Sequence, residues 1–350
     1  MPGLFASIAG GQQPIVATTA PIPAATAKVI HSPALFQSEE PLEVTFTTNI
    51  DRIRHDKSAD APWRPATLTY KASDGNLLSV PLRARTRGIW RLRECDFPPL
   101  RLNFSGESSK GTVFHHLDKP KLVSYCKNSD SHEQYVLQEF QLYRIYHLLT
   151  PVSHKARLLK FAYADSATGK IRAHRYGFIM EEGSALGARL GGKVLDQKGA
   201  LPGDLDAFQD ALFGVFQYFV GNTDFSESEL HNVELLFNPD GVVMPIAYDF
   251  DFAGAVNATY ATPPPMLNLP NVRQRLFRGY CVDRESYARV FALFNDKKTQ
   301  IYGLYSDPIG KLLDARTAKE TLRYFDSFYE TINNSRLAKG EITGSCIKRP

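Results

Sequence analysis

Residues 221–254 read GNTDFSESELHNVELLFNPDGVVMPIAYDFDFAG, and this stretch decides how the chain is expected to fold. VELLFN and VVMPIAYDF predict two strands that Pro239-Asp240-Gly241 joins into a hairpin. An amphipathic helix precedes the stretch, with Asp204 expected as its N-cap and Gly221 as its C-terminal stop. The chain therefore passes from a helix through a polar loop into a hairpin, which ends on Asp249 and Asp251.

The sequence upstream of this helix is rich in predicted strands. Apolar and polar residues alternate in several stretches, and one helix interrupts them after Ser131 and ends at Thr150-Pro151. The expected strands are 42–50, 66–72, 77–90, 99–104, 112–117, 121–126, 155–165 and 174–182. Downstream, residues 283–338 are mainly helical in pattern, with a last long helix from about Thr317. The fold class predicted is α+β.

Composition restricts the class of protein. The chain has 350 residues, 43% of them apolar and 22% charged, which is typical of a globular protein rather than a disordered or fibrous one. Its 41 basic and 37 acidic residues give a formal charge of +4, too weak for a dedicated nucleic-acid binder. Each hydrophobic run is broken by charge, Pro or Gly, so no transmembrane segment is expected.

The cysteines and the leader leave the location of the protein open. Residues 1–36 lack periodicity and are expected to be a disordered or processed leader, without Lys or Arg before Lys28. Exported and cytoplasmic locations both fit. The four cysteines lack metal-binding spacing, and free thiols or one disulfide would both fit. In an exported protein, Cys95 and Cys126 are the expected pair.

The order of elements also predicts where chemistry would lie. In protein kinases, an Asp after such a hairpin and an Asn before it hold metal ions, and a second Asp in the loop faces the acceptor hydroxyl. Asn232, Asp249 and Asp251 are accordingly the candidate metal ligands, and Asp224 is the candidate catalytic residue, with His231 orienting its loop. Asp249 and Asp251 are expected on one face of an extended segment. Turn-capping polar residues and a solvated strand end are the alternatives.

A nucleotide would need groups that hold its phosphates. Lys121 precedes the predicted helix that carries Glu139, and an ion pair between such residues orients a lysine toward phosphate in kinases. Lys119 and Glu133 compete for these roles, Arg101 is a further basic candidate, and a solvated Lys and Glu are the alternative. The loop SGESSKG, with Ser105, Gly106 and Gly111, either cradles phosphate through its amides or is a plain hairpin turn. Arg83, Arg85 and Arg87 recur at period two, which predicts a basic stripe on one strand face, either solvated or facing an anion.

These motifs resemble those of the spore coat protein H (CotH) family of atypical kinases. The resemblance covers residues 83–255 and lies in RTRGIW (85–90), KLVSYC (121–126) and PIAYDFD (245–251). The chain departs from the family pattern at Tyr248, where Trp is expected. The resemblance implies a two-lobed kinase-like fold that binds ATP with Mg²⁺ or Mn²⁺.

The interpretation is therefore an ATP- and metal-dependent phosphotransferase that acts on a hydroxyl of a protein or small molecule. A β-rich lobe over residues 37–185 and a mainly helical lobe over 186–350 would enclose the nucleotide. Two alternatives stay open. One is a pseudokinase or binding module without turnover, and the other is a β-rich surface protein whose acidic residues bind Ca²⁺.

Overall fold

The computed structural model describes residues 33–58 and 60–348, so most of the predicted leader lies outside the described residues. The folded part begins earlier than residue 37. Leu35 and Phe36, in the short 3₁₀ helix η1 (Ala34–Gln37), are buried in the core of the β-rich half. The amide of Leu35 donates to the carbonyl of Val113 at 2.9 Å, which ties this segment to the sheet.

Seven strands form a closed barrel in the order β1-β2-β3-β4-β5-β7-β6. β1 pairs parallel with β6 and closes the barrel, and the other neighbours are antiparallel. Buried and exposed residues alternate along β2 and β3, as expected for strands with one face toward a core. The strands are β1 (Leu42–Thr48), β2 (Arg64–Lys71), β3 (Leu77–Thr86), β4 (Leu100–Phe104), β5 (Lys121–Val123), β6 (Ala156–Asp165) and β7 (Ile171–Met180).

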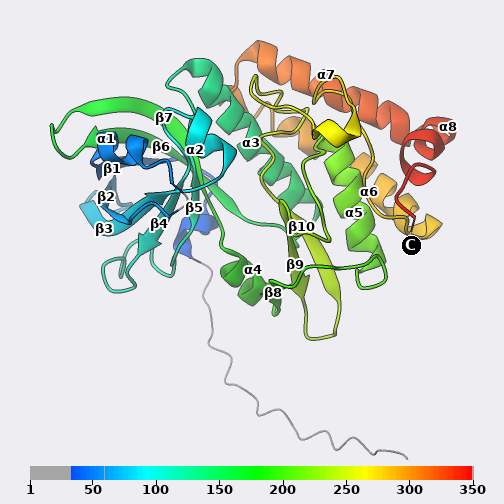
Figure 1. Cartoon of the computed structure of the whole chain (residues 1–350), viewed down its shortest axis with the longest axis horizontal. Coiled ribbons are helices and arrows are strands. Elements are labelled where there is room, and N and C mark those ends of the chain that lie inside the picture. The colour runs from blue at the N-terminus through cyan, green and yellow to red at the C-terminus, as the bar shows by residue number, and fades with distance from the viewer. Residues whose placement is uncertain (1–32, 59, 349–350) are drawn as a thin grey trace, which may run out of the picture.

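A second sheet, in the order β10-β9-β8, lies in the helical half of the molecule. Figure 1 shows the barrel on one side, this sheet below the centre and the helices on the other side. The sheet comprises β8 (Lys193–Leu195), β9 (Val233–Phe237) and β10 (Val243–Ala247). The remaining elements are α1 (Ile50–His55), α2 (Trp90–Glu94), α3 (Asp130–Leu149), α4 (Gly183–Arg189), α5 (Ala207–Val220), η2 (Pro265–Leu267), α6 (Arg284–Gly303), η3 (Gly310–Leu312), α7 (Ala315–Ile332), α8 (Ser335–Ala338) and η4 (Lys339–Thr343).

The described residues form two hydrophobic cores. The smaller core fills the barrel, and the larger one surrounds α3, α5 and the C-terminal helices. Val123 and Met180 lie on the barrel wall but belong to the larger core, whereas Leu122 points into the barrel. The helix α3 therefore packs the outer wall of the barrel against the helical half, and residues 37–185 contribute to both cores.

Two local predictions were wrong. Residues 112–117 form turns rather than a strand, because Phe114 turns inward and packs against Tyr70 and Phe104 in the barrel core. The N-cap of α5 is Asp206, whose side chain accepts from the amide of Gln209 at 2.8 Å. Asp204 instead accepts from the amide of Leu201.

Two disulfides, Cys95–Cys126 and Cys281–Cys346, use all four cysteines. The sequence led us to expect free thiols or one disulfide, and the first pair is the one expected of an exported protein. Cys95 directly follows α2, and Cys126 lies between β5 and α3. Within the described part of the chain, no helix has the length and apolarity that crossing a bilayer requires.

Candidate functional site

Three carboxylates meet between α3 and the turn that follows β10. Glu139, near the middle of α3, offers an oxygen within 4.8 Å of oxygens of Asp249 and Asp251. Asp249 has a positive φ of 63°, and its amide donates to the hydroxyl of Tyr143 at 2.9 Å. A turn therefore brings the two aspartates together, and not the alternation of an extended strand. Between them, Phe250 is fully buried against aromatic side chains and anchors the turn.

The cation nearest to these carboxylates is Arg91 of α2. Its Nη2 lies 2.5 Å from Oδ2 of Asp251 and 3.6 Å from Oε2 of Glu139, and its Nε donates to Asp251 at 3.0 Å. Arg91 was not predicted as a site residue, because no local sequence signal indicates that the segment between β3 and β4 contacts Glu139 of α3. Arg87, the third residue of the RTRGIW motif, was predicted only as part of the basic stripe.

Burial and charge act in opposite directions on these carboxyl groups. Burial raises the pKa of Glu139 well above its usual value and that of Asp251 to about 6, although the Arg91 charge opposes both shifts. Burial would also raise the pKa of Asp249. The charges of Arg91, Arg87 and Lys121 outweigh that effect and lower it. The nearby cations therefore outweigh the effect of burial on the pKa of Asp249, but not on the pKa of Glu139 or Asp251.

The cluster fits a hard divalent cation. Oε1 of Glu139 is buried and lacks a hydrogen-bond partner among the described residues, and the Glu139 side chain is 2% exposed. A buried carboxylate oxygen without a partner is costly unless a cation or proton satisfies it. Carboxylate oxygens from Glu139, Asp249 and Asp251 are the ligand type that Mg²⁺ and Mn²⁺ prefer.

A second acidic group lies in the loop after α5. The backbone of Gly221 adopts the left-handed conformation, with φ of 68°, and ends α5 as expected. The carboxylate of Asp224 then lies 2.8 Å from Nε2 of His231, and its Oδ2 accepts from Nδ2 of Asn232 at 3.1 Å. Arg278 holds this loop by donating to the carbonyls of Thr223 and Phe225. His231 and Asn232 thus orient Asp224, and His231 has the contact that was predicted for it.

The hairpin brings this loop beside the acidic turn. Val233 pairs with Ala247, and the amide of Tyr248 donates to the carbonyl of Asn232 at 3.3 Å. Asn232 is therefore adjacent to Asp249. The charge of Asp224 also contributes to the raised pKa of Asp251, after burial and the nearer groups. The four residues named from the motif thus lie around one region, although Asp224 is not part of the group of three carboxylates.

Lys121 lies in the same region but without the predicted glutamate partner. Its Nζ is 3.8 Å from the ring centroid of Tyr248, and burial lowers its pKa to about 8. Glu139 contacts Arg91 instead. Of the competing residues, Glu133 accepts from the amide of Tyr176 at 2.7 Å, and Lys119 forms an exposed ion pair with Asp118. The expected Lys–Glu pair is replaced by an Arg–Glu pair.

The loop with Ser105, Gly106 and Gly111 lies away from this region. β4 begins beside Lys121, because Arg101 pairs with Lys121, and it ends at Phe104, whose amide donates to Asp118. The loop leaves from that far end. The hydroxyl of Ser109 donates to the carbonyl of Ser105 within the loop itself. These contacts within the loop fit the turn interpretation.

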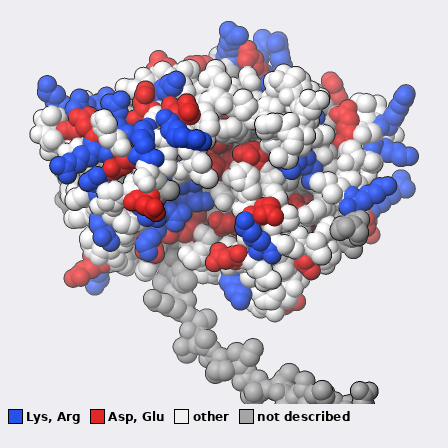
Figure 2. Space-filling model, in the orientation of Figure 1, with Lys and Arg blue, Asp and Glu red and all other residues white. Residues whose placement is uncertain are grey.

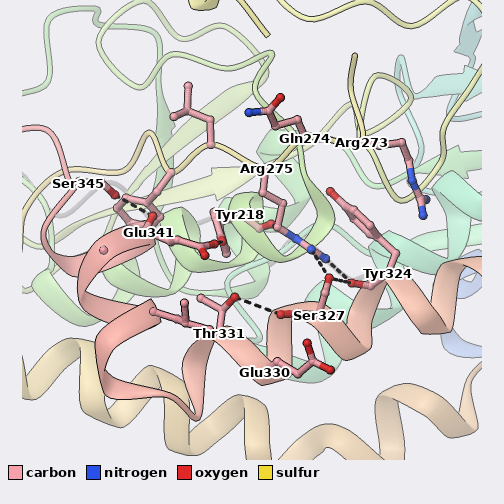
Figure 3. A pocket seen from close by; sticks show the side chains of 14 residues that line it. Tyr218, Arg273, Gln274, Arg275, Tyr324, Ser327, Glu330, Thr331, Glu341 and Ser345 are labelled. Atoms are coloured by element: carbon pink, nitrogen blue, oxygen red, sulfur yellow. Dashed lines mark hydrogen bonds between the residues drawn. The ribbon is translucent and has the colours of Figure 1, made fainter. Parts of the chain in front are cut away.

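A separate groove of about 750 Å³ lies on the helical half, between α5, α7 and the C-terminus. Figure 3 shows Arg275 pointing across it toward Ser327 and the backbone of Tyr324. The guanidinium also donates to the carbonyl of Phe219 and stacks on the ring of Tyr324 at 3.6 Å. Since its donors are used by the backbone of two helices, Arg275 has a structural role.

No protein-family model matches the chain, and no curated protein matches it in sequence. The function is therefore inferred from the geometry of the residues around Asp249.

Proposed function

We propose that this protein is an ATP- and divalent-metal-dependent phosphotransferase of two-lobed, kinase-like architecture that acts on a hydroxyl acceptor. The observation that carries the proposal is the buried carboxylate cluster of Glu139, Asp249 and Asp251, with its unpartnered Glu139 oxygen. A cluster of this type beside a desolvated lysine and a third, oriented aspartate is what phosphoryl transfer requires.

The residues divide into three roles. Asp249, Asp251 and Asn232 would hold Mg²⁺ or Mn²⁺, with Glu139 as an additional ligand. When bound, the metal would neutralise phosphate charge. The ammonium of Lys121 contributes a positive charge toward the phosphates of the nucleotide.

Asp224 would orient the acceptor hydroxyl and take its proton. Its carboxylate is suited to this task, because the side chain is 30% exposed and is held by His231 and Asn232. Asn232 uses its amide nitrogen on Asp224, so the amide oxygen is the atom that it presents to a metal.

A pseudokinase is the second candidate. It is favoured by the contact of Arg91 with Asp251, which occupies a carboxylate oxygen that a metal would need. In that case nucleotide would bind beside Lys121 without turnover.

Calorimetric titration tests the proposal. ATP with Mg²⁺ should bind, whereas Ca²⁺ alone should give no heat of binding. Incubation with γ-labelled ATP and candidate acceptors, including the protein itself, should then show label transfer. Binding without transfer to any acceptor would favour the pseudokinase, and binding of Ca²⁺ alone would favour a calcium-binding surface protein.

A further inference from the structure

Three neighbouring strands of the barrel place basic residues directly opposite one another. Arg85 of β3 pairs with Arg101 of β4, and Arg101 pairs with Lys121 of β5. Residues in register have their side chains on the same face of the sheet. Their neighbours Ala84, Leu102 and Leu122 are buried in the barrel core, so this row lies on the outer face. We call Arg85, Arg101 and Lys121 the cation row.

The Lys121 end of the cation row faces the helical half. Val123 follows Lys121 on the same face by alternation and packs in the larger core with α3. Burial, then the charge of Arg87, lowers the pKa of both Arg101 and Lys121. Arg87 thus adds a fourth positive charge beside the row. In Figure 2, Lys and Arg side chains gather over the barrel half of the visible face, next to acidic side chains near its centre.

The charges of the row are poorly compensated. Among the described residues, the ion pairs within 4.0 Å include none of Arg85, Arg87, Arg101 and Lys121. Two acidic side chains are close enough to raise the pKa of Arg101, but both have other contacts. Glu182 accepts from the amides of Asp118 and Lys119, and Glu234 lies 3.2 Å from His154.

Like charges placed opposite one another across a sheet destabilise it. Three in succession, partly desolvated and without an ion pair within 4.0 Å among the described residues, would be unfavourable unless an anion binds to them, and Asp249 acts on the Lys121 end alone. All three side chains are only partly buried, so a ligand could reach them. The row spans two strand spacings, or about 10 Å, which is too long for a single phosphate group to contact at both ends.

We propose that the cation row, with Arg87, is a binding site for a chain of linked phosphates that lies across strands β3, β4 and β5. The chain would run from Lys121, next to Asp249, outward over Arg101 to Arg85. A nucleoside triphosphate and inorganic tripolyphosphate share this chemistry. The inference deepens the proposed function by assigning residues to the phosphates. It rests on the proposed function only in taking the ligand to be a nucleotide, because binding of the phosphate chain itself does not require that function.

Tripolyphosphate binding, measured by calorimetry in EDTA, tests the site without metal or turnover. The full chain should bind tripolyphosphate and ATP but not adenosine. Arg101→Gln and Arg85→Gln should each weaken tripolyphosphate binding about ten-fold or more, since each removes charge-assisted hydrogen bonds. Arg83→Gln is the matched control. Arg83 is on the same strand and face, but it pairs with Asn103 one step away from the row, and its variant should bind as wild type does.

A second measurement separates binding from folding. Without ligand, Arg101→Gln should unfold at the same temperature as wild type or higher, because it relieves repulsion within the row. Tripolyphosphate should raise the unfolding temperature of wild type more than that of the variant. A lower unfolding temperature with unchanged ligand response would mean that Arg101 only packs, and the proposal would be wrong.

Other outcomes would also overturn the proposal. Equal weakening in all three variants would indicate nonspecific charge attraction, and tighter binding of a hexaglutamate peptide than of tripolyphosphate would indicate a protein partner. The outcome for the proposed function is separable. Tripolyphosphate binding without label transfer would support the phosphate site at the cation row and reject the phosphotransferase. Label transfer with an unchanged KM for ATP in Arg101→Gln would support the phosphotransferase and reject the phosphate site.

Discussion

The guanidinium of Arg91 lies 2.5 Å from the carboxylate of Asp251, although 160 residues separate them in the chain. Both side chains are nearly buried, with 11% and 7% of their surfaces exposed. The contact joins the segment between β3 and β4 to the turn after β10. It also places one positive charge among the three carboxylates that we propose as metal ligands.

Replacing Arg91 with Met should destabilise the metal-free protein by about 3 kcal/mol, because removing one partner of a buried ion pair leaves uncompensated charge. Mn²⁺ should stabilise this variant more than it stabilises wild type, since the metal would replace the lost positive charge. Thermal unfolding with and without Mn²⁺ measures both effects. Arg93→Met, at an exposed position on the same helix, should change neither. An equal response to Mn²⁺ in all three proteins would argue against a metal site here.

Replacing Asp249 with Asn should abolish metal-dependent phosphoryl transfer and leave the fold intact. The substitution keeps the shape of the side chain and removes the charge that a hard divalent cation requires. Label transfer from γ-labelled ATP, compared with the circular dichroism spectrum of the same preparation, checks the expectation. Undiminished transfer in the variant would rule out the proposed role of Asp249.

The sequence was sufficient to predict the elements around the acidic turn. Alternating residues and the Pro239-Asp240-Gly241 turn predicted the hairpin, and its register brings Asn232 next to Tyr248 and Asp249. Long helices such as α3 were also predictable, because many residues repeat the same apolar pattern. These features depend on local sequence, so local sequence reveals them.

Contacts between distant segments could not be predicted in this way. Glu139 was expected to pair with Lys121, yet Arg91 reaches it from a five-residue helix that has no clear sequence signal. The strand predicted at residues 112–117 does not form, because burial of Phe114 in the barrel outweighs the local preference for an extended strand. The cation row depends on the register of three strands, although the period-two arginines indicated one part of it.

Replacing Asp224 with Asn should spare nucleotide binding and lower turnover by about 10² to 10⁴, the usual contribution of a positioned base. Its carboxylate contacts His231 and Asn232 and is outside the group of three carboxylates, so the three carboxylate ligands should persist. ATP affinity and the rate of label transfer, measured side by side, separate the two effects. A parallel loss of affinity would instead place Asp224 among the ligand-holding residues.

The two disulfides should contribute similarly to stability but differently to the site. Loops of 31 and 65 residues predict a loss of about 4 kcal/mol for each bond when its cysteines are replaced by Ser. Only Cys95–Cys126 adjoins α2, so only its loss should also weaken Mn²⁺ binding, by releasing Arg91 and the segment around it. Calorimetric titration of both double variants with Mn²⁺ provides the comparison, and equal affinities would show that the Cys95–Cys126 bond does not support the site.

The pH dependence of ATP binding should report on Lys121. Burial, ahead of the Arg87 charge, lowers the pKa of Lys121 to about 8, so ATP affinity should fall as pH rises through 8 and the ammonium loses its charge. Lys121→Arg should bind ATP with little change between pH 7 and 9.5, because an arginine stays charged over this range.

Stability should change in the opposite direction. Between about pH 8 and the unfolded-state pKa of about 10.4, the unfolded chain binds more protons at this lysine than the folded one does, so the Lys121 contribution to the free energy of unfolding rises with pH. Subtracting the denaturation profile of Lys121→Met from that of wild type isolates this contribution. If ATP affinity has the same pH profile in wild type and Lys121→Arg, another group controls the binding of phosphate.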